Sequence, residues 1–364
     1  MKFGILKEYD DQRVAIVPEI VPKLKQLGLE ILVETQAGAT ALFSDALYQE
    51  HASVVSRQEV LSQSDMLISI HPLSDADLLQ VRKGALLISQ FAPFANPGVA
   101  EKLQGKGFQA FSLDMIPRTT LAQSMDVLSS MAGIAGYKAV LEAARQLPRY
   151  FPMMITAAGT IRPARVLILG AGVAGLQAVA TARRLGAQVE AFDTRRAAKE
   201  EVESLGAKFV EVEGAVDDTA AGGYAVAQSE EFLARQRAEV QARAAKADVI
   251  ITTAQVRGTK APILLPKETV AHMKPGSVVV DLAASTGGNC ELTQDNAVIQ
   301  AHHVTIIGNS YLANLMPQDA SVMYANNVLN FIKTFVKDGK LNLDMNNEII
   351  RGALITPIPE TQNA

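Results

Sequence analysis

The sequence predicts an α/β protein of two doubly wound Rossmann-like domains, and three observations lead to this fold class. Short apolar runs alternate with stretches of helical periodicity along most of the chain, the pattern of repeated βα units and mostly parallel sheets. At 364 residues the chain is too long for one ordinary domain, so two are expected. A glycine-rich dinucleotide motif lies near the middle of the chain.

The first 115 or so residues predict a doubly wound domain that has no glycine-rich phosphate loop of its own. Apolar runs predict strands at 3–6, 29–33, 66–70, 85–89 and 108–111, and helical spacing predicts helices at 18–27, 75–81 and 97–103. This half therefore provides a sheet with helices on both faces but no nucleotide motif.

Residues 115–131 interrupt this alternation. Arg118, Gln123, Asp126 and Ser129 lie close together here, just before a long helix predicted at 129–146. Such a set could be no more than a solvated turn and a helix cap. The segment also enters the junction between two α/β domains, where a cleft normally holds the ligand, so a binding role is the competing interpretation.

A dinucleotide-binding βαβ unit organises the second domain. Its predicted elements are a strand at 166–169, a helix at 176–185 and a strand at 187–192. Gly170 allows the tight turn after the first strand, Gly172 lets the backbone approach a pyrophosphate, and Gly175 lets the helix pack closely on the strand. The phosphates would meet free N–H groups and the positive end of the helix dipole.

The residue after the second strand of this unit indicates the cofactor. Asp193 stands where a carboxylate accepts hydrogen bonds from both adenosine ribose hydroxyls, and a 2′-phosphate there would meet like charge. Arg195 and Arg196 argue the other way, since arginine can hold that phosphate. Because Asp193 stands directly at the strand end, we expect NAD(H) rather than NADP(H).

The rest of the chain completes the second domain and returns to the first. Further strands are predicted at 208–212, 248–253, 277–282 and 304–307, and helices at 199–205, 229–246 and 319–336. Residues 151–160 are expected to be a linker, and 341–354, with Asn346 and Asn347 at its middle, a hairpin. The excursion 213–247 carries Gly222, Gly223 and Tyr224, which suggests a mobile flap.

These elements predict a discontinuous first domain, 1–127 plus 312–364, and a dinucleotide-binding domain, 128–311. Two long helices, 129–146 and 319–336, would join the domains and leave a cleft between them.

Composition excludes several classes of function. The net charge of −4 argues against nucleic-acid binding, which usually requires a basic surface. No apolar stretch approaches the roughly 20 residues that cross a bilayer. The start of the chain lacks the pattern of a signal peptide, so a cytoplasmic protein is expected. Cys290 is the single cysteine and is expected to be a small buried residue, and the five histidines lack metal-ligand spacing, so we predict no metal.

Several stretches together resemble one family. They are PRTTLAQSMDVLSSMAGIAGYKAV, PMMITAAGTIRPARVLILGAGVAGLQAVATARRLGA, IITTA, KPGSVVVDLA and GGNC. This combination resembles the soluble NAD(H)-binding component of proton-translocating NAD(P) transhydrogenase. The resemblance implies an enzyme active only with partners: membrane-spanning subunits that couple proton translocation, and a domain that binds NADP(H). It also implies a homodimer held peripherally at the inner face of the cytoplasmic membrane.

The resemblance also implies roles for individual residues. Arg118, Asp126 and Ser129 would fix the nicotinamide carboxamide and its ribose, with Ser124 and Met125 in the same loop, and Gln123 would bridge toward the partner's NADP(H). Val173 and the run Asp193, Thr194 and Arg195 would hold the pyrophosphate and the adenosine ribose. Gly223, Tyr224 and Gln236 belong to the flap over the adenosine side, and Gln255 lies near the adenine.

Two alternatives stay open. The opening KEYDDQRVAIVP is shared with alanine dehydrogenase, and Arg13 matches the residue that holds the substrate carboxylate in that enzyme. Ile70 and Gln90, however, stand at its catalytic lysine and histidine positions, with His71 one place away. Oxidation of an amino acid needs an acid/base, whereas hydride transfer between two nicotinamides needs juxtaposed rings. The other alternative, a non-enzymatic NAD(H)-sensing module, would not need the 118–126 loop.

Overall fold

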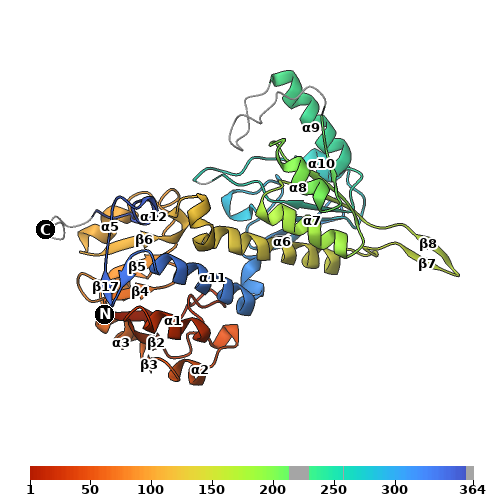
Figure 1. The fold of residues 1–364 in the computed structure, drawn as a ribbon. Helices are drawn as coiled ribbons and strands as arrows, with labels where there is room; N and C mark the ends of the chain where they lie inside the picture. The colour runs from red at the N-terminus through yellow and green to blue at the C-terminus, as the bar shows by residue number, and fades with distance from the viewer. Residues whose placement is uncertain (213–228, 257, 358–364) are drawn as a thin grey trace. The chain divides into compact units, whose positions relative to one another are not determined.

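The computed structural model describes residues 1–212, 229–256 and 258–357. The chain divides into two compact units, and each unit has its own sheet (Figure 1). Unit 1 is Met1–Met131 with Asn314–Ala364, and unit 2 is Ala132–Ala313. The domain limits expected from the sequence, 1–127 plus 312–364 and 128–311, stay a prediction.

Unit 1 contains a six-stranded sheet in the order β3-β2-β1-β4-β5-β6, with every neighbouring pair parallel. The strands are β1 Lys2–Ile5, β2 Glu30–Glu34, β3 Ser53–Val55, β4 Met66–Ile68, β5 Leu86–Ser89 and β6 Gln109–Ser112. The chain starts at a central strand and winds to one side and then to the other, which confirms the predicted doubly wound fold. β3, a short strand at the sheet edge, was not predicted.

Helices bury both faces of this sheet. They are η1 Pro18–Ile20, α1 Val21–Lys25, η2 Ala39–Ala41, α2 Asp45–Gln49, α3 Arg57–Gln63, α4 Asp75–Leu78, α5 Val99–Gly105, η3 Leu113–Met115, η4 Thr120–Met125, α11 Pro317–Ile332 and α12 Glu348–Ala353. One face packs on α1 and α11, where Phe111 of β6 meets the ring of Phe331 at 5.2 Å between centroids. The other face packs on α3, α4 and α5. The C-terminal segment therefore completes the core of unit 1.

Unit 2 contains a seven-stranded sheet in the order β11-β10-β9-β12-β13-β15-β14. The strands are β9 Arg165–Leu169, β10 Gln188–Phe192, β11 Lys208–Phe209, β12 Val249–Thr252, β13 Val278–Asp281, β14 Ala297–Ala301 and β15 Val304–Gly308. Its first six positions repeat the doubly wound order of unit 1. The antiparallel edge strand β14 was not predicted: its apolar run is only three residues long, Ala297 to Ile299, and is then broken by Gln300.

The helices of unit 2 also form two layers. They are α6 Val127–Gln146, α7 Val173–Arg184, α8 Ala198–Ser204, α9 Glu230–Ala244 and α10 Lys267–Ala271, with the short η5 Ala284–Thr286 and η6 Leu312–Leu315. Residues of α6, α7 and α8 cover one face of the sheet, and residues of α9 and α10 cover the other. α6 begins in unit 1 and continues into unit 2, and the chain returns to unit 1 within η6, just before α11.

Two local predictions were wrong. The stretch 341–354 is not a hairpin: strands β16 Val336–Lys337 and β17 Lys340–Leu341 pair before it, and α12 fills its second half. The side chain of Asn347 accepts from the N–H of Ile349 at 2.9 Å, so this asparagine caps a helix instead of forming a hairpin turn.

The second error concerns 151–160, which is not a plain linker. The antiparallel strands β7 Met154–Thr156 and β8 Gly159–Ile161 form a hairpin that extends from unit 2 (Figure 1).

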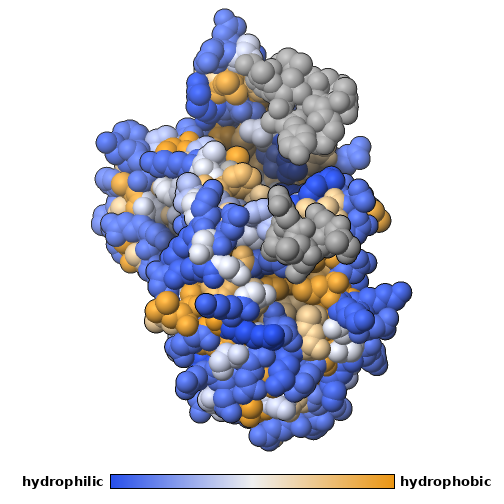
Figure 2. Space-filling view, turned by 90° about the vertical axis from the view of Figure 1, so that its left-hand side faces the viewer, coloured by the Kyte–Doolittle hydropathy of each residue, from blue (hydrophilic) through white to orange (hydrophobic). Residues whose placement is uncertain are grey.

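The described surface is mixed in polarity. On the face drawn in Figure 2, hydrophobic residues form separate patches within a mainly hydrophilic surface. No helix among the described residues has the length and apolar character needed to span a bilayer.

Candidate functional site

The glycine-rich turn of unit 2 has the geometry that its motif predicts. Gly170 has a φ of +104°, and a Cβ there would lie 2.5 Å from Oγ1 of Thr253. A Cβ on Gly175 would lie 1.8 Å from the carbonyl oxygen of Gly170, so only glycine lets α7 approach β9 this closely. Around Gly172 no atom lies within 4 Å of a Cβ position, and the backbone there is open to a ligand.

The start of α7 is also open. Gly172 is its N-cap and provides no side-chain hydrogen bond, while Val173 at the first helical position is half-exposed. The N–H groups of the first turn are thus left to solvent or to an anion, and the helix dipole favours an anion. α6 packs against this end of α7, because a Cβ on Gly136 would lie 2.0 Å from the carbonyl oxygen of Ala174.

Asp193 stands at the end of β10, as predicted, and its carboxylate is already bound. It accepts from the N–H of Ala171 at 2.7 Å, which ties the glycine-rich turn to the neighbouring strand. It also accepts from the N–H of Arg195 at 2.8 Å and pairs with the guanidinium of Arg195 at 3.0 Å. Ribose hydroxyls would therefore have to share the Asp193 carboxylate with Arg195 or displace the Arg195 side chain from it. While the guanidinium of Arg195 is paired with Asp193, it is held at that carboxylate and not at a 2′-phosphate.

Further residues at the carboxyl edge of this sheet hold loops in place. Asp281 is fully buried and accepts from the N–H groups of Ala283, Asn289 and Cys290 and from the hydroxyl of Thr293. These contacts explain the GGNC stretch as a turn wrapped around a carboxylate.

The remaining residues predicted in unit 2 are placed as follows. The amide of Gln255 donates to the carbonyl of Leu282 at 3.0 Å, so its side chain lies at the same edge of the sheet. Thr194 is exposed after β10, and Gln236 is half-buried on α9. Cys290 is buried as expected, and burial raises the pKa of its thiol. The predicted flap, with Gly223 and Tyr224, lies outside the described residues.

The loop predicted to bind the nicotinamide belongs to unit 1. Asp126 and Ser129 form a helix cap at the start of α6: the carboxylate accepts from the N–H of Ser129 at 2.9 Å and from its hydroxyl at 2.6 Å. Arg118 and Gln123 are exposed, and neither side chain has a hydrogen bond or ion pair within the described chain. Met125 packs its side chain into the core of unit 1, so it would reach a ligand through its backbone.

Two residues that were not predicted as part of the site fix this loop. The side-chain amides of Asn327 and Asn330 on α11 donate to the carbonyl oxygen of Ser124 at 2.8 and 3.2 Å. Asn327 is buried, and its side-chain oxygen has no hydrogen-bond partner among the described residues. No local sequence pattern points to this contact, because about 200 residues separate its partners.

A buried ionic network occupies the opening segment of unit 1. The guanidinium of Arg13 binds the carboxylate of Asp11 through Nε at 2.9 Å, and Asp11 also binds Nε2 of His71 at 2.9 Å. Glu8 accepts from the N–H groups of Ile70 and His71 at 2.6 and 3.2 Å. Arg13 and His71 are recognisable from the sequence, but the two carboxylates that hold them are not.

This network shifts the proton affinities of its members. Burial alone would raise the pKa of Asp11, but hydrogen bonds from Arg13 and His71 outweigh burial and hold that pKa well below its usual range. The hydrogen bond to Asp11 raises the pKa of His71, and burial raises the pKa of Glu8. Close by, Gln90 donates to the hydroxyl of the fully buried Tyr324 at 3.2 Å.

Comparison with known proteins identifies the family. The family model described as "Alanine dehydrogenase/PNT, N-terminal domain" matches residues 4–135, and the corresponding C-terminal domain model matches 139–360. The first part of NAD(P) transhydrogenase subunit alpha of Rhodospirillum rubrum is 43% identical over 369 residues, covering 98% of this chain and 96% of that protein.

Solved structures give the same answer. A transhydrogenase crystal structure from Sinorhizobium meliloti matches with a TM-score of 0.90 and 41% identity over 98% of each chain. An L-alanine dehydrogenase structure matches with a TM-score of 0.79 and 26% identity, over 97% of this chain and 94% of that one. The chain therefore belongs to the alanine dehydrogenase/PNT family, and within that family to the NAD(P) transhydrogenase alpha subunits.

Proposed function

We propose that this chain is the NAD(H)-binding subunit of a proton-translocating transhydrogenase. It would pass hydride between NAD(H) held here and NADP(H) held on a partner, while membrane-spanning subunits couple the transfer to proton movement. In this role it would sit peripherally at the cytoplasmic face of the membrane. One observation carries the proposal: the dinucleotide turn is intact in unit 2 of a chain that belongs to the NAD(P) transhydrogenase alpha subunits.

The side chains of unit 1 support this choice. By the resemblance to alanine dehydrogenase, Ile70 and Gln90 stand at the positions of that enzyme's lysine and histidine. Ile70 is fully buried, and the amide of Gln90 donates to the hydroxyl of Tyr324. Arg13, which matches the dehydrogenase residue that holds the substrate carboxylate, is already paired with Asp11. An amino acid would find neither a free guanidinium nor a lysine and histidine in these places, whereas a hydride can pass between two nicotinamides without either.

The nucleotide contacts belong to the same proposal. Gly170, Gly172, Val173 and Gly175 would face the pyrophosphate, and Asp193 with Thr194 and Arg195 would face the adenosine ribose. Arg118, Asp126 and Ser129, with Ser124 and Met125, would fix the nicotinamide and its ribose. Gln123 would span the two nucleotides. Gly223, Tyr224, Gln236 and Gln255 would act on the adenosine side.

The test is to mix the purified chain with NADH and a thio-analogue of NADP, with and without an NADP(H)-binding transhydrogenase subunit. We expect hydride transfer only when the partner is present. Gln123→Asn should leave NADH binding nearly unchanged and depress transfer, because the shortened amide no longer reaches the second nucleotide. Oxidation of NADH by the chain alone, driven by pyruvate plus ammonia, would instead identify an alanine dehydrogenase.

The Asn327 contact gives a second prediction. Asn327→Ala removes one of two amides that hold the Ser124 carbonyl, so the loop carrying Gln123 loses its support from α11. We expect the rate of partner-dependent transfer to fall by about 10- to 100-fold, since small displacements of reacting groups have effects of this size. Asn326→Ala is the matched control, because that exposed amide bonds only within its own helix. Equal rates for the two variants would refute the positioning role.

We also propose that two copies of the chain associate through the β7–β8 hairpin. Ile155 is 71% exposed and Met153 57% exposed on this hairpin, and two-stranded hairpins are marginally stable in water by themselves. A second copy would cover these side chains.

Ile155→Glu should weaken dimerisation by at least about 100-fold, because a dimer of two identical chains loses two buried Ile side chains, each contributing ~1.5–3 kcal/mol. Sedimentation equilibrium measures the change, and Ile155→Val serves as the control that keeps the apolar contact. A wild-type chain that is monomeric at all concentrations would exclude the arrangement.

A further inference from the structure

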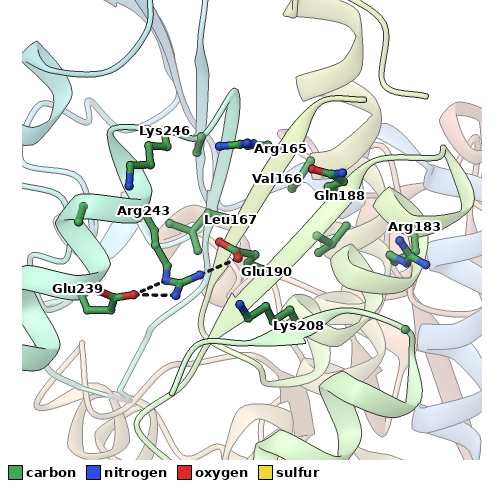
Figure 3. Close-up of a pocket in the computed structure, with 14 residues that line it drawn as sticks. Arg165, Val166, Leu167, Arg183, Gln188, Glu190, Lys208, Glu239, Arg243 and Lys246 are labelled. Atoms are coloured by element: carbon green, nitrogen blue, oxygen red, sulfur yellow. Dashed lines mark hydrogen bonds and ion pairs between the residues drawn. The ribbon is translucent and has the colours of Figure 1, made fainter. Parts of the chain in front are cut away.

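Unit 2 contains a pocket of about 540 Å³ (Figure 3). Arg165, Gln188 and Lys208, which begin β9, β10 and β11, line one side of it. Residues from Glu239 to Ala247, in and just after the second half of α9, line the other. The glycine-rich turn follows the opposite, carboxyl end of β9. The pocket is therefore separate from the proposed nucleotide site.

The floor of this pocket is polar. Glu190 pairs in register with Leu167 on one side and with Lys208 on the other, and Arg165 pairs with Gln188 two residues earlier. Side chains two residues apart point to the same face, so these polar groups share the face that α9 covers. Arg165, Gln188 and Lys208 are exposed at the first positions of their strands, so this polar face is open to solvent and to a ligand.

The pocket has more positive charges than negative ones. Its cations are Arg165, Arg183, Lys208, Arg243 and Lys246, and its anions are Glu190 and Glu239. Five cations less two carboxylates leave an excess of three positive charges, in a chain whose net charge is −4.

Both carboxylates are already used. Figure 3 shows the guanidinium of Arg243 between them, at 2.6 Å from Glu190 and 2.6 Å from Glu239. Arg165, Lys208 and Lys246 have no carboxylate within ion-pair distance in the described chain, so an added anion would meet unpaired cations on both walls.

We propose that this pocket binds a small molecule that carries two or more phosphate groups. Guanidinium groups recognise phosphate oxygens through paired hydrogen bonds, and lysines add point charges, so the two cation types suit phosphate together. The unpaired cations are spread over both walls of a space larger than one phosphate group needs, which favours a diphosphate over a single phosphate. The ligand would bind together with NAD(H), because the dinucleotide turn lies at the other end of the strands.

Inorganic pyrophosphate is the probe, titrated calorimetrically into the full chain saturated with NADH. We expect saturable binding, weakened about tenfold by Lys208→Ala and similarly by Lys246→Ala, since each removes one charge-assisted contact. Arg184→Ala is the matched control: this exposed cation neighbours Arg183 on α7 but does not line the pocket. Lys246 lies just beyond the end of α9, so its variant keeps the test valid if Lys208→Ala folds poorly.

Several results would overturn the proposal. They are an absence of saturable binding, an equal loss in Arg184→Ala and both lysine variants, displacement of pyrophosphate by NADH, and equal affinity for citrate. The third would place the anion on the dinucleotide turn, and the fourth would remove the preference for phosphate.

Discussion

Asp11→Ala is expected to destabilise the protein by about 3–5 kcal/mol, because it leaves the buried guanidinium of Arg13 without its counter-charge. Both residues are less than a tenth exposed, and His71 would lose the same partner. Urea denaturation of the full chain, followed by far-UV circular dichroism and tyrosine fluorescence, measures the loss. Asp10→Ala is the matched control, since that neighbouring carboxylate is exposed.

The double variant Asp11→Ala/Arg13→Met tests whether the loss of stability comes from the uncompensated charge of Arg13. Removing both charges should recover most of the lost stability, because a buried pair is often no better than apolar side chains of similar size. If the double variant is as unstable as Asp11→Ala alone, the uncompensated charge is not the cause.

The same network predicts how stability depends on pH. The pKa of Asp11 is held below its ordinary value of 3.8, so its contribution is present above that value and is lost as the pH falls further. The pKa of His71 is raised above its ordinary value of 6.5, so its contribution is present below 6.5 and is lost as the pH rises through the raised value. These two contributions are present together between about pH 4 and 6.5.

Asp193→Ala is expected to weaken NADH binding by about one to two decades. A hydrogen bond from a ribose hydroxyl to a carboxylate contributes roughly 1.5–3 kcal/mol, and a loss of that size weakens binding by about one to two decades. The variant also removes the acceptor that ties the N–H of Ala171 to the end of β10, so the glycine-rich turn loses an anchor. Calorimetric titration of NADH into the wild type and the variant measures the change.

NADPH provides the control for this prediction. With Asp193 in place, a 2′-phosphate meets like charge, and Arg195 is engaged by that carboxylate. The wild type should therefore prefer NADH, and Asp193→Asn should narrow the preference by removing the charge while keeping an acceptor. Equal affinity of the wild type for both nucleotides would contradict the assignment.

The sequence by itself determined the features that depend on a few neighbouring residues. Apolar runs placed most strands of both sheets, since a strand buried on both faces must be apolar throughout. The spacing of Gly170, Gly172 and Gly175 determined the turn into α7, because a positive φ and a contact of 1.8 Å each exclude a side chain. Asp126 was recognised as a candidate cap by its place before a helix, and the structure places it there.

Only the tertiary structure decided which distant residues support the site. Asn327 and Ser124 come together because α11 returns to the sheet of unit 1, and Asp11 meets His71 because β1 and β4 are adjacent in that sheet. Local patterns also misled at 341–354, where Asn347 suits a turn or a helix cap equally well and the packing of Ile349 and Ile350 into the core selects the helix. Backbone preferences act over a few residues, whereas these contacts depend on the order in which strands and helices pack.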